Sequence, residues 1–191
     1  KTSHGAEPWQ GINALEQGFG LLADLREELM REEHPVLGRS TLQVTMAEGG
    51  IAPNMTPDRA QFLADIRIVP PLNEKEVLNR LECLIEKRCE VYNGGLSFTP
   101  EISNYRMPVE TGPKNQWLHR LKGFIGDDAG ETGINYFTDA SIFLTAWPDS
   151  PALLFGPGEP QMCHKPNEYV EISKYFEAIR VMEKFCWYIA K

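Results

Sequence analysis

The sequence predicts an α/β protein in which amphipathic helices alternate with short strands. Two observations carry this prediction. Apolar residues recur at intervals of three and four along several segments, as in helices with one buried face, and they alternate with polar residues along others, as in half-buried strands. The chain of 191 residues is 42% hydrophobic and 24% charged, which is typical of a folded globular protein.

The first predicted helix runs from residue 12 to about residue 31, because its apolar residues share one face. They are Leu15, Phe19, Leu22, Leu25 and Leu29. Strict alternation over residues 41–47 then predicts a strand that buries Leu42, Val44 and Met46.

A second strand is expected over residues 60–69, after a loop rich in glycine and proline. Its alternation leaves Asp65 and Arg67 facing outward, and its inward residues are Phe62, Ala64, Ile66 and Ile68. Asn73, with Glu76 three residues later, resembles a capping box and predicts a second helix. A short strand over residues 96–99 follows that helix.

The order helix, strand, strand, helix, strand over residues 9–104 lacks only a first strand to make a split βαβ unit. We therefore expect residues 1–104 to form a ferredoxin-like lobe whose first strand lies before Lys1. Residues 105–191 have a different character and predict a second lobe. The expected elements there are a helix over 115–125, a strand over 134–137, a short helix from Thr138-Asp139 through Thr145 and a buried strand over 152–155.

The last predicted helix has a broad apolar face that must pack on a sheet. Its members are Ile172, Phe176, Ile179, Met182, Phe185, Cys186 and Ile189. We expect part of this face to be exposed or covered by another polypeptide.

Charge and cysteine content exclude several classes of function. The formal net charge is -8 and the basic residues are scattered among acidic ones, so no stripe offers the phosphate-neutralising surface of a nucleic-acid-binding protein. No window is long and apolar enough for a membrane span. The four cysteines show no Cys-x-x-Cys pair, so reduced thiols and a cytoplasmic location are expected.

The loop 156–168 places His164 between an apolar run and the last helix, with Gly156 and Gly158 where a backbone can pass close to a ligand. One interpretation is that His164 is a metal ligand. The alternative is that it caps or packs, because a lone histidine shows no partner in the sequence.

Four motifs in order resemble the M20 metallopeptidases and deacylases. They are His4-Gly5-Ala6-Glu7-Pro8 running to Gly11-Ile12-Asn13-Ala14, Gly49-Gly50-Ile51-Ala52-Pro53-Asn54, Asp65-Ile66-Arg67, and the His164 loop. The resemblance is to the C-terminal part of the proteins of that family, which includes acetylornithine deacetylases and succinyl-diaminopimelate desuccinylases. The family's His-x-Asp, bridging Asp and Glu-Glu motifs lie upstream of Lys1, so the chain is expected to be about half an enzyme and inactive alone.

The resemblance implies a role for each matching residue. His164 would bind one of two zinc ions, with cobalt or manganese as other metals, and the backbone of Gly156 and Gly158 would border the substrate. His4 would cross the dimer and donate a hydrogen bond to the developing oxyanion in the neighbouring site. Its alternative role is that of a polar residue near a helix entrance.

Asn54 and Arg67 also have two interpretations each. By resemblance Asn54 contacts the substrate, whereas an asparagine in such a loop can instead serve a left-handed backbone. Arg67 is expected to bind a substrate carboxylate through its planar guanidinium, and the alternative is an exposed ion pair with Asp65.

The function implied is that of a zinc-dependent amidohydrolase that deacylates N-acyl amino acids. Residues 1–104 would be its dimerisation domain, or lid lobe, and residues 105–191 the C-terminal part of its catalytic domain. The expected partners are a second copy through the lid lobe, the missing N-terminal half and a small N-acyl amino acid or peptide. The alternatives are an M20 di- or tripeptidase and, in another class, a non-catalytic self-associating binding module.

Overall fold

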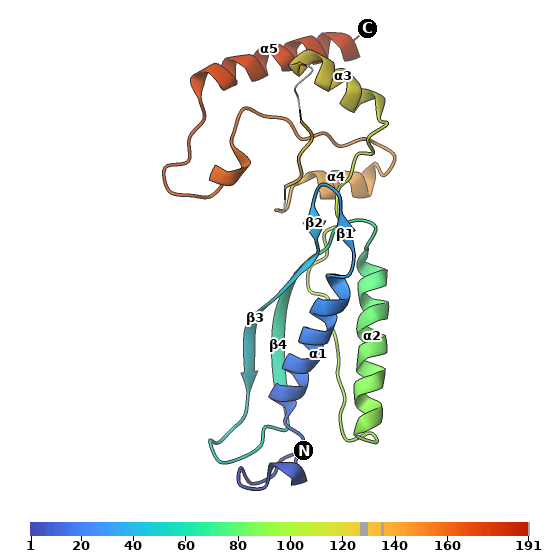
Figure 1. Cartoon of the computed structure of the whole chain (residues 1–191), viewed down its shortest axis with the longest axis vertical. Helices are drawn as coiled ribbons and strands as arrows, with labels where there is room; N and C mark the ends of the chain where they lie inside the picture. The colour runs from blue at the N-terminus through green and yellow to red at the C-terminus, as the bar shows by residue number, and fades with distance from the viewer. Residues whose placement is uncertain (127–129, 135, 191) are drawn as a thin grey trace. The chain divides into compact units, whose positions relative to one another are not determined.

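The computed structural model describes residues 1–126, 130–134 and 136–190 (Figure 1). It divides into two compact units, Lys1–Pro108 and Val109–Lys191, with the division a few residues beyond the predicted one. Helices and strands are mixed, and the predicted α/β class is confirmed.

Two helices form one layer of unit 1. Helix α1 (Ala14–Leu29) begins where the Asn13 side chain accepts hydrogen bonds from the backbone N–H groups of Leu15 and Glu16. Helix α2 (Glu74–Val91) begins at Asn73, whose side chain accepts from the Glu76 N–H at 3.1 Å. Both helices were predicted, and each begins at an asparagine because that side chain satisfies N–H groups that the helix leaves unpaired.

The strands β3 (Thr41–Gly49) and β4 (Ala60–Arg67) pair as an antiparallel hairpin beside these helices (Figure 1). The alternation predicted for β4 is confirmed, with Asp65 and Arg67 exposed. A bulge between Val44 and Met46 interrupts β3. Since an extra residue reverses the alternation, Met46 is 56% exposed, and its predicted burial is wrong.

The core of unit 1 lies between α1, the hairpin and α2. Its buried members are Leu25, Leu29, Leu42, Leu72 and Val77. Two arginines of α2 also reach α1, where Arg80 pairs with Glu32 just beyond the helix and Arg88 pairs with Asp24. Apolar packing and these ion pairs together fix α1 against α2.

The loop after α1 contains two strands that were not predicted, β1 (Glu33–His34) and β2 (Gly38–Arg39). Gly38, the first residue of β2, has a φ of 75°. The strand predicted over residues 96–99 is wrong, because these residues lie in an irregular segment. A strand requires a hydrogen-bonded neighbour, and in the described residues the ladders of unit 1 pair β1 with β2 and β3 with β4 without residues 96–99.

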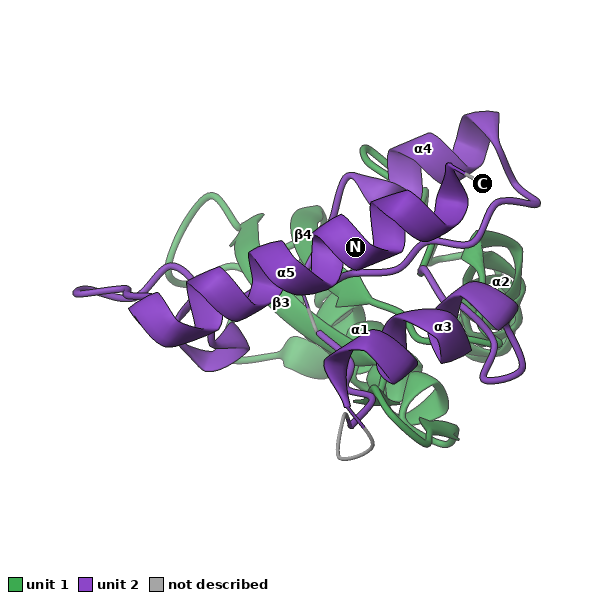
Figure 2. Ribbon diagram, turned by 90° about the horizontal axis from the view of Figure 1, so that it is seen from above, with its two compact units in different colours: residues 1–108 green, residues 109–191 purple. Residues whose placement is uncertain are grey.

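Unit 2 is built on α3 (Gln116–Ile125) and α5 (Ile172–Ile189), which lie beside each other (Figure 2). Trp117 and Phe124 of α3 contact Phe185 and Tyr188 of α5 through edge-to-face ring pairs. The short helix α4 (Ala140–Ala146) lies where it was predicted.

Neither strand predicted for unit 2 is seen in the residues that the structure describes. Residues 152–155 are irregular, and the backbone N–H and C=O of Ala152 bond to the Thr111 hydroxyl at 3.1 and 2.7 Å. A side chain thus satisfies groups that a neighbouring strand would otherwise pair. Of residues 134–137, position 135 lies outside the described residues and the other three are in no strand.

The apolar face of α5 is largely exposed, as expected. Ile172, Phe176 and Ile179 are 74%, 53% and 46% exposed. Such a face is unusual on a free surface and favours burial against further polypeptide. Within the described residues, none of the helices has the length and apolar character needed to span a bilayer.

Gly18 allows α1 to approach the hairpin closely. A Cβ at this position would lie 2.1 Å from the ring of Phe62, which also packs edge-to-face on Phe19. We expect Gly18→Ala to lower the free energy of unfolding by about 1–2 kcal/mol, because overpacking exceeds the gain in helix propensity. Guanidinium unfolding with hydrogen exchange of α1 amides measures this effect.

Gly123→Ala is the matched control for Gly18→Ala. Gly123 also lies in a helix, but a Cβ there would meet nothing within 4 Å. Its replacement is expected to be neutral or to stabilise by up to ~1 kcal/mol. Equal effects of the two substitutions would contradict the close approach at Gly18.

Candidate active-site residues

The N-terminal segment and the loop between β3 and β4 form one end of unit 1, which we call the tip (residues 1–12 and 50–57). The Gly5 N–H donates to the Asn54 carbonyl at 2.8 Å, and the Thr56 N–H donates to the Ser3 carbonyl at 3.0 Å. The hydroxyls of Ser3 and Thr56 also bond at 2.7 Å. His4 therefore pairs with Met55 in an antiparallel bridge, next to Asn54.

Further backbone bonds close the tip and attach it to α1. Lys1 and Ile12 exchange two hydrogen bonds, at 2.8 and 3.2 Å, and the Ala14 N–H donates to the Pro57 carbonyl. Gly11 is required here, because a Cβ would lie 2.5 Å from the Ser3 hydroxyl. The tip is thus a defined platform for the side chains it carries.

The His4 side chain is exposed, and its Nδ1 accepts a hydrogen bond from the Ala6 N–H at 3.1 Å. An accepting Nδ1 carries no proton, so the neutral imidazole has its proton on Nε2. The imidazole can therefore donate a hydrogen bond through Nε2–H. No sequence pattern identified the Ala6 contact, since it depends on the turn closed by the Glu7 N–H and the His4 carbonyl.

Asn54 is exposed in the tip, and its carbonyl is the acceptor for Gly5. The described non-glycine residues with positive φ are Asn93, His164 and Asn167. The alternative explanation of Asn54 as a left-handed loop residue is therefore wrong.

Arg67 is held by Asp65 on the exposed face of β4. Its Nε and Nη2 donate to the two carboxylate oxygens at 2.6 and 2.7 Å, and this bond raises the pKa of Arg67. The ion pair expected as the alternative thus exists. The Asp65 carboxylate occupies the edge of the guanidinium that is formed by Nε and Nη2.

Arg67 also lies far from His4 and Asn54. In the hairpin Ala60 pairs with Gly49 beside the tip, whereas Arg67 pairs with Thr41 at the other end. The length of β4, at ~3.3 Å per residue, separates these ends by about 23 Å. The structure therefore brings His4 and Asn54 together and keeps Arg67 apart.

His164 lies in unit 2, on the loop that follows the short 3-10 helix η2 (Pro160–Met162). Its φ of 61° is uncommon for a residue other than glycine, and its N–H donates to Glu168 Oε2 at 3.1 Å. Beside it the Tyr136 hydroxyl and the Cys163 sulfur bond at 3.3 Å, which raises the pKa of Tyr136. Unfavourable backbone geometry held by neighbouring contacts is frequent at functional sites.

The described residues do not by themselves form a metal site. Among them, no cluster of three or more His, Cys, Asp or Glu side chains is arranged to hold an ion. A metal ion bound by His164 would therefore need further ligands from outside this set.

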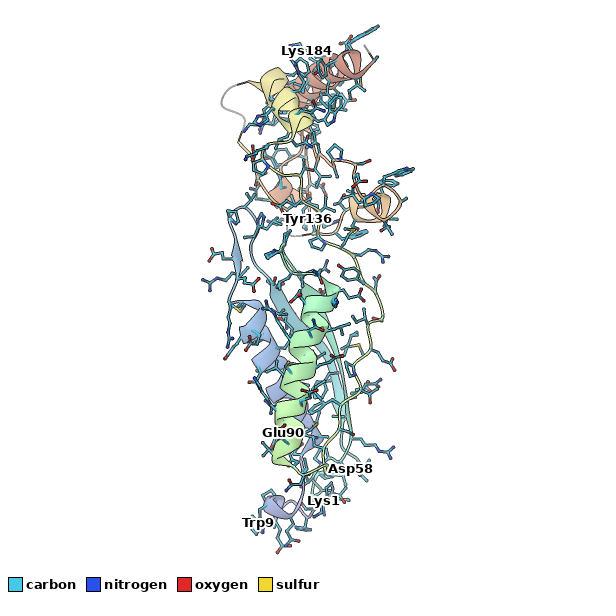
Figure 3. All side chains as sticks on the ribbon, turned by 90° about the vertical axis from the view of Figure 1, so that its right-hand side faces the viewer. Lys1, Trp9, Asp58, Glu90, Tyr136 and Lys184 are labelled. Carbon is cyan, nitrogen blue, oxygen red and sulfur yellow. The ribbon has the colours of Figure 1, made fainter. Side chains whose placement is uncertain are left out.

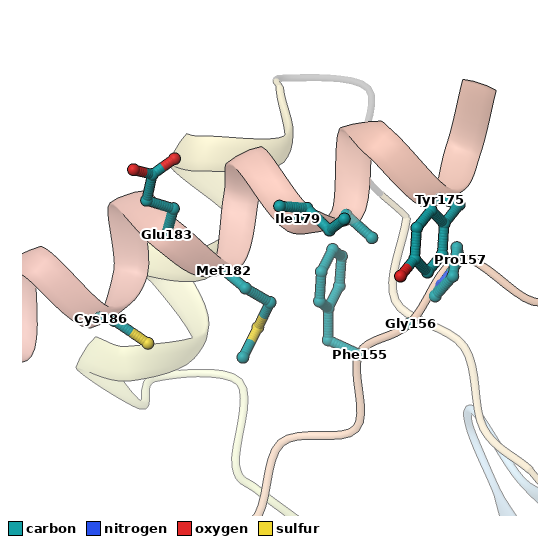
Figure 4. A pocket seen from close by; sticks show the side chains of 9 residues that line it. Phe155, Gly156, Pro157, Tyr175, Ile179, Met182, Glu183 and Cys186 are labelled. Atoms are coloured by element: carbon teal, nitrogen blue, oxygen red, sulfur yellow. The ribbon is translucent and has the colours of Figure 1, made fainter. Parts of the chain in front are cut away.

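Gly156 and Gly158 have open space around them, since a Cβ at either position would meet nothing within 4 Å. Gly156 lines an apolar groove of about 430 Å³ that runs along α5 (Figure 4). Phe155, Tyr175 and Met182 are among its other walls. The contacts within the described residues do not explain why glycine occupies positions 156 and 158.

Comparison with known proteins adds to these observations. A family model described as a peptidase dimerisation domain, that of the M20 group, matches residues 1–93. The acetylornithine deacetylase of Shigella sonnei is 27% identical over 98% of this chain and 50% of its own length. Residues 1–93 thus belong to the M20 dimerisation-domain family, and the chain as a whole is similar to these enzymes. It spans about half the length of this deacetylase.

Two solved structures share the M20 fold with this chain. An aminopeptidase from Bacillus cereus matches with a TM-score of 0.69 and 19% identity, over 100% of this chain and 49% of its own. An M20 metallo-carboxypeptidase from Sulfolobus solfataricus matches with a TM-score of 0.60 and 16% identity, over 97% of this chain and 54% of its own. Both matches extend across units 1 and 2, so both units share their fold with these two enzymes.

Proposed function

We propose that this chain supplies the dimerisation lobe and the C-terminal catalytic part of an M20 hydrolase that deacylates N-acyl amino acids. The observation that carries the proposal is the tip, where His4 presents an Nε2–H donor beside Asn54. The likeness to an acetylornithine deacetylase, which extends over both units, supports this substrate class.

In the proposed reaction His4 stabilises charge that develops on the amide oxygen. When the amide carbonyl becomes tetrahedral, its oxygen gains negative charge, and Nε2–H donates to it. A donor that is already oriented costs no reorganisation during the reaction, which is why the Ala6 contact matters. Asn54, next to His4, would hold the substrate through its side-chain amide.

We propose that His164 binds one of two zinc ions, with the other ligands and the general base supplied by a segment that precedes Lys1. Zinc would polarise the amide carbonyl and activate water. Gly156 and Gly158 would let the substrate approach the backbone, which fits the open space around both.

His4 and Asn54 would act in the site of a second copy. The match of residues 1–93 to a dimerisation domain supports a homodimer through unit 1. Arg67, about 23 Å from the tip along β4, would bind a substrate carboxylate in a different site from the one that its own His4 serves. For this role it must exchange Asp65 for the substrate or use its remaining nitrogen.

The test compares this chain with the longer protein that includes the preceding segment. Zinc content and hydrolysis of N-acetyl and N-succinyl amino acids and of di- and tripeptides are measured for both. Two zinc ions and deacylation by the longer protein alone are expected, together with a cytoplasmic location. Peptide hydrolysis would favour the peptidase alternative, and self-association without zinc or hydrolysis would favour a binding module.

A further inference from the structure

The tip carries an exposed apolar surface in addition to His4 and Asn54. Trp9, in the short 3-10 helix η1 (Pro8–Gln10), is 75% exposed, and Ile51 and Met55 are 83% and 37% exposed. Figure 3 shows Trp9 at the extreme end of the tip, beyond Lys1 and Asp58. A tryptophan side chain has one of the largest apolar surfaces of any residue, so its exposure at this position is costly unless something covers it.

The backbone that carries Trp9 is also held in a defined position. The Gln10 N–H donates to the Glu7 carbonyl and the Gly11 N–H to the Pro8 carbonyl, both at 3.1 Å. The bonds between Lys1 and Ile12 then close the segment. Aromatic side chains held rigidly on a surface lose little entropy on binding and are enriched among the residues that dominate interfaces.

A second copy of this protein is the occupant that the family match favours. His4 can act only where a substrate is activated, and within the described residues no metal-binding cluster lies near it in unit 1. Trp9 lies in the same closed segment as His4, so whatever surface receives His4 also meets Trp9. The family match of residues 1–93 to a dimerisation domain supplies the partner, which is another copy.

We propose that Trp9 anchors the tip on the catalytic part of a second copy and thereby positions His4. This inference rests on the proposed function of His4. Trp9 is a positioning residue here, because its effect on the reaction passes through the histidine.

A double-mutant cycle in the longer, metal-loaded protein tests this role. Trp9→Ala is expected to lower kcat/KM about 30-fold, the effect of a typical aromatic anchor, and Trp9→Phe to retain most of the activity. In a His4→Ala background Trp9→Ala should have no further effect. An equal effect of Trp9→Ala in both backgrounds would overturn the proposal. The control is Val36→Ala, because the Val36 side chain is 47% exposed at the turn between β1 and β2.

Dimers that contain two different variants show which copy's Trp9 supports the activity of a given metal site. A His4→Ala copy, whose own metal site is intact, is mixed with a His164→Ala copy, whose own tip is intact. The active site of such a mixed dimer is the metal site of the first copy together with the tip of the second. Trp9→Ala in the second copy should reduce the recovered activity about 30-fold, and in the first copy should leave it unchanged. The proposal would be overturned if Trp9→Ala had the same effect in either copy, or no effect in both.

Failure of the proposed function gives a different result from failure of this inference. If His4→Ala alone retains activity, the role of His4 is wrong. If His4→Ala is inactive and Trp9→Ala is fully active, the role of His4 stands and the anchor is wrong.

Discussion

His4→Ala is expected to lower kcat of the longer protein by about 10²- to 10³-fold, with little change in KM. This magnitude is that of removing one prepared donor to an oxyanion, because such a donor acts in the transition state more than on the bound substrate. His4→Gln should recover part of the loss, since its side-chain amide also presents an N–H. Steady-state kinetics with an N-acetyl amino acid measures both parameters.

His119→Ala is the matched control. His119 is likewise exposed, but it lies on α3 and matches no motif. It should have kinetics close to those of the unchanged protein. A rise in KM without a fall in kcat on His4→Ala would contradict the role in the transition state and indicate ordinary substrate binding.

His164→Ala is expected to reduce the zinc bound per copy and to abolish hydrolysis, because loss of a ligand to a paired site disturbs both ions. Zinc content provides a readout that does not depend on activity. If His164 merely caps its loop, zinc content will be unchanged. The substitution would then alter stability alone.

Mixing the His4→Ala and His164→Ala proteins should restore activity. In a mixed dimer, the site with an intact His164 receives an intact His4 from the other copy. Random assortment makes half of the dimers mixed, and one of the two sites in each is complete, so about a quarter of the full activity is expected. This is a rise of at least 25-fold over either variant if each retains less than about 1%.

Mixed dimers that form without recovering activity would show that His4 serves its own copy. Mass spectrometry of differently labelled copies confirms that exchange has occurred. A second mixture, with Arg67→Ala in place of His4→Ala, tests whether Arg67 and His4 serve different sites. If Arg67 serves the site of its own copy, no recovery with His164→Ala is expected.

The sequence predicted the helices of this chain well because their signals are local. Asn13 and Asn73 cap α1 and α2, and the apolar stripes of α1 and α5 follow the helical period. The strands at 96–99 and 152–155 were wrong for the opposite reason. An apolar run becomes a strand only when another backbone pairs with it, and the Thr111 hydroxyl bonds Ala152 instead.

Within the candidate site, the motifs selected residues but not their neighbours. His4 and Asn54 are fifty residues apart in the sequence, and the bond between Gly5 and Asn54 joins them. Arg67 is much nearer to Asn54 in sequence, yet the extended β4 carries it to the other end of the hairpin. The ion pair of Arg67 with Asp65 was foreseeable, because residues two apart share a strand face.

The sequence by itself determined the α/β class, the positions of the principal helices, and the resemblance to the M20 family through motifs in a fixed order. The tertiary structure decided which of these motifs meet, that the Ala6 N–H bonds to Nδ1 of His4, and that Met46 turns outward at a bulge. The physical reason is that periodicity and capping act over a few residues. Pairing of distant backbones depends on the whole chain, and small local changes such as one extra residue in a strand redirect it.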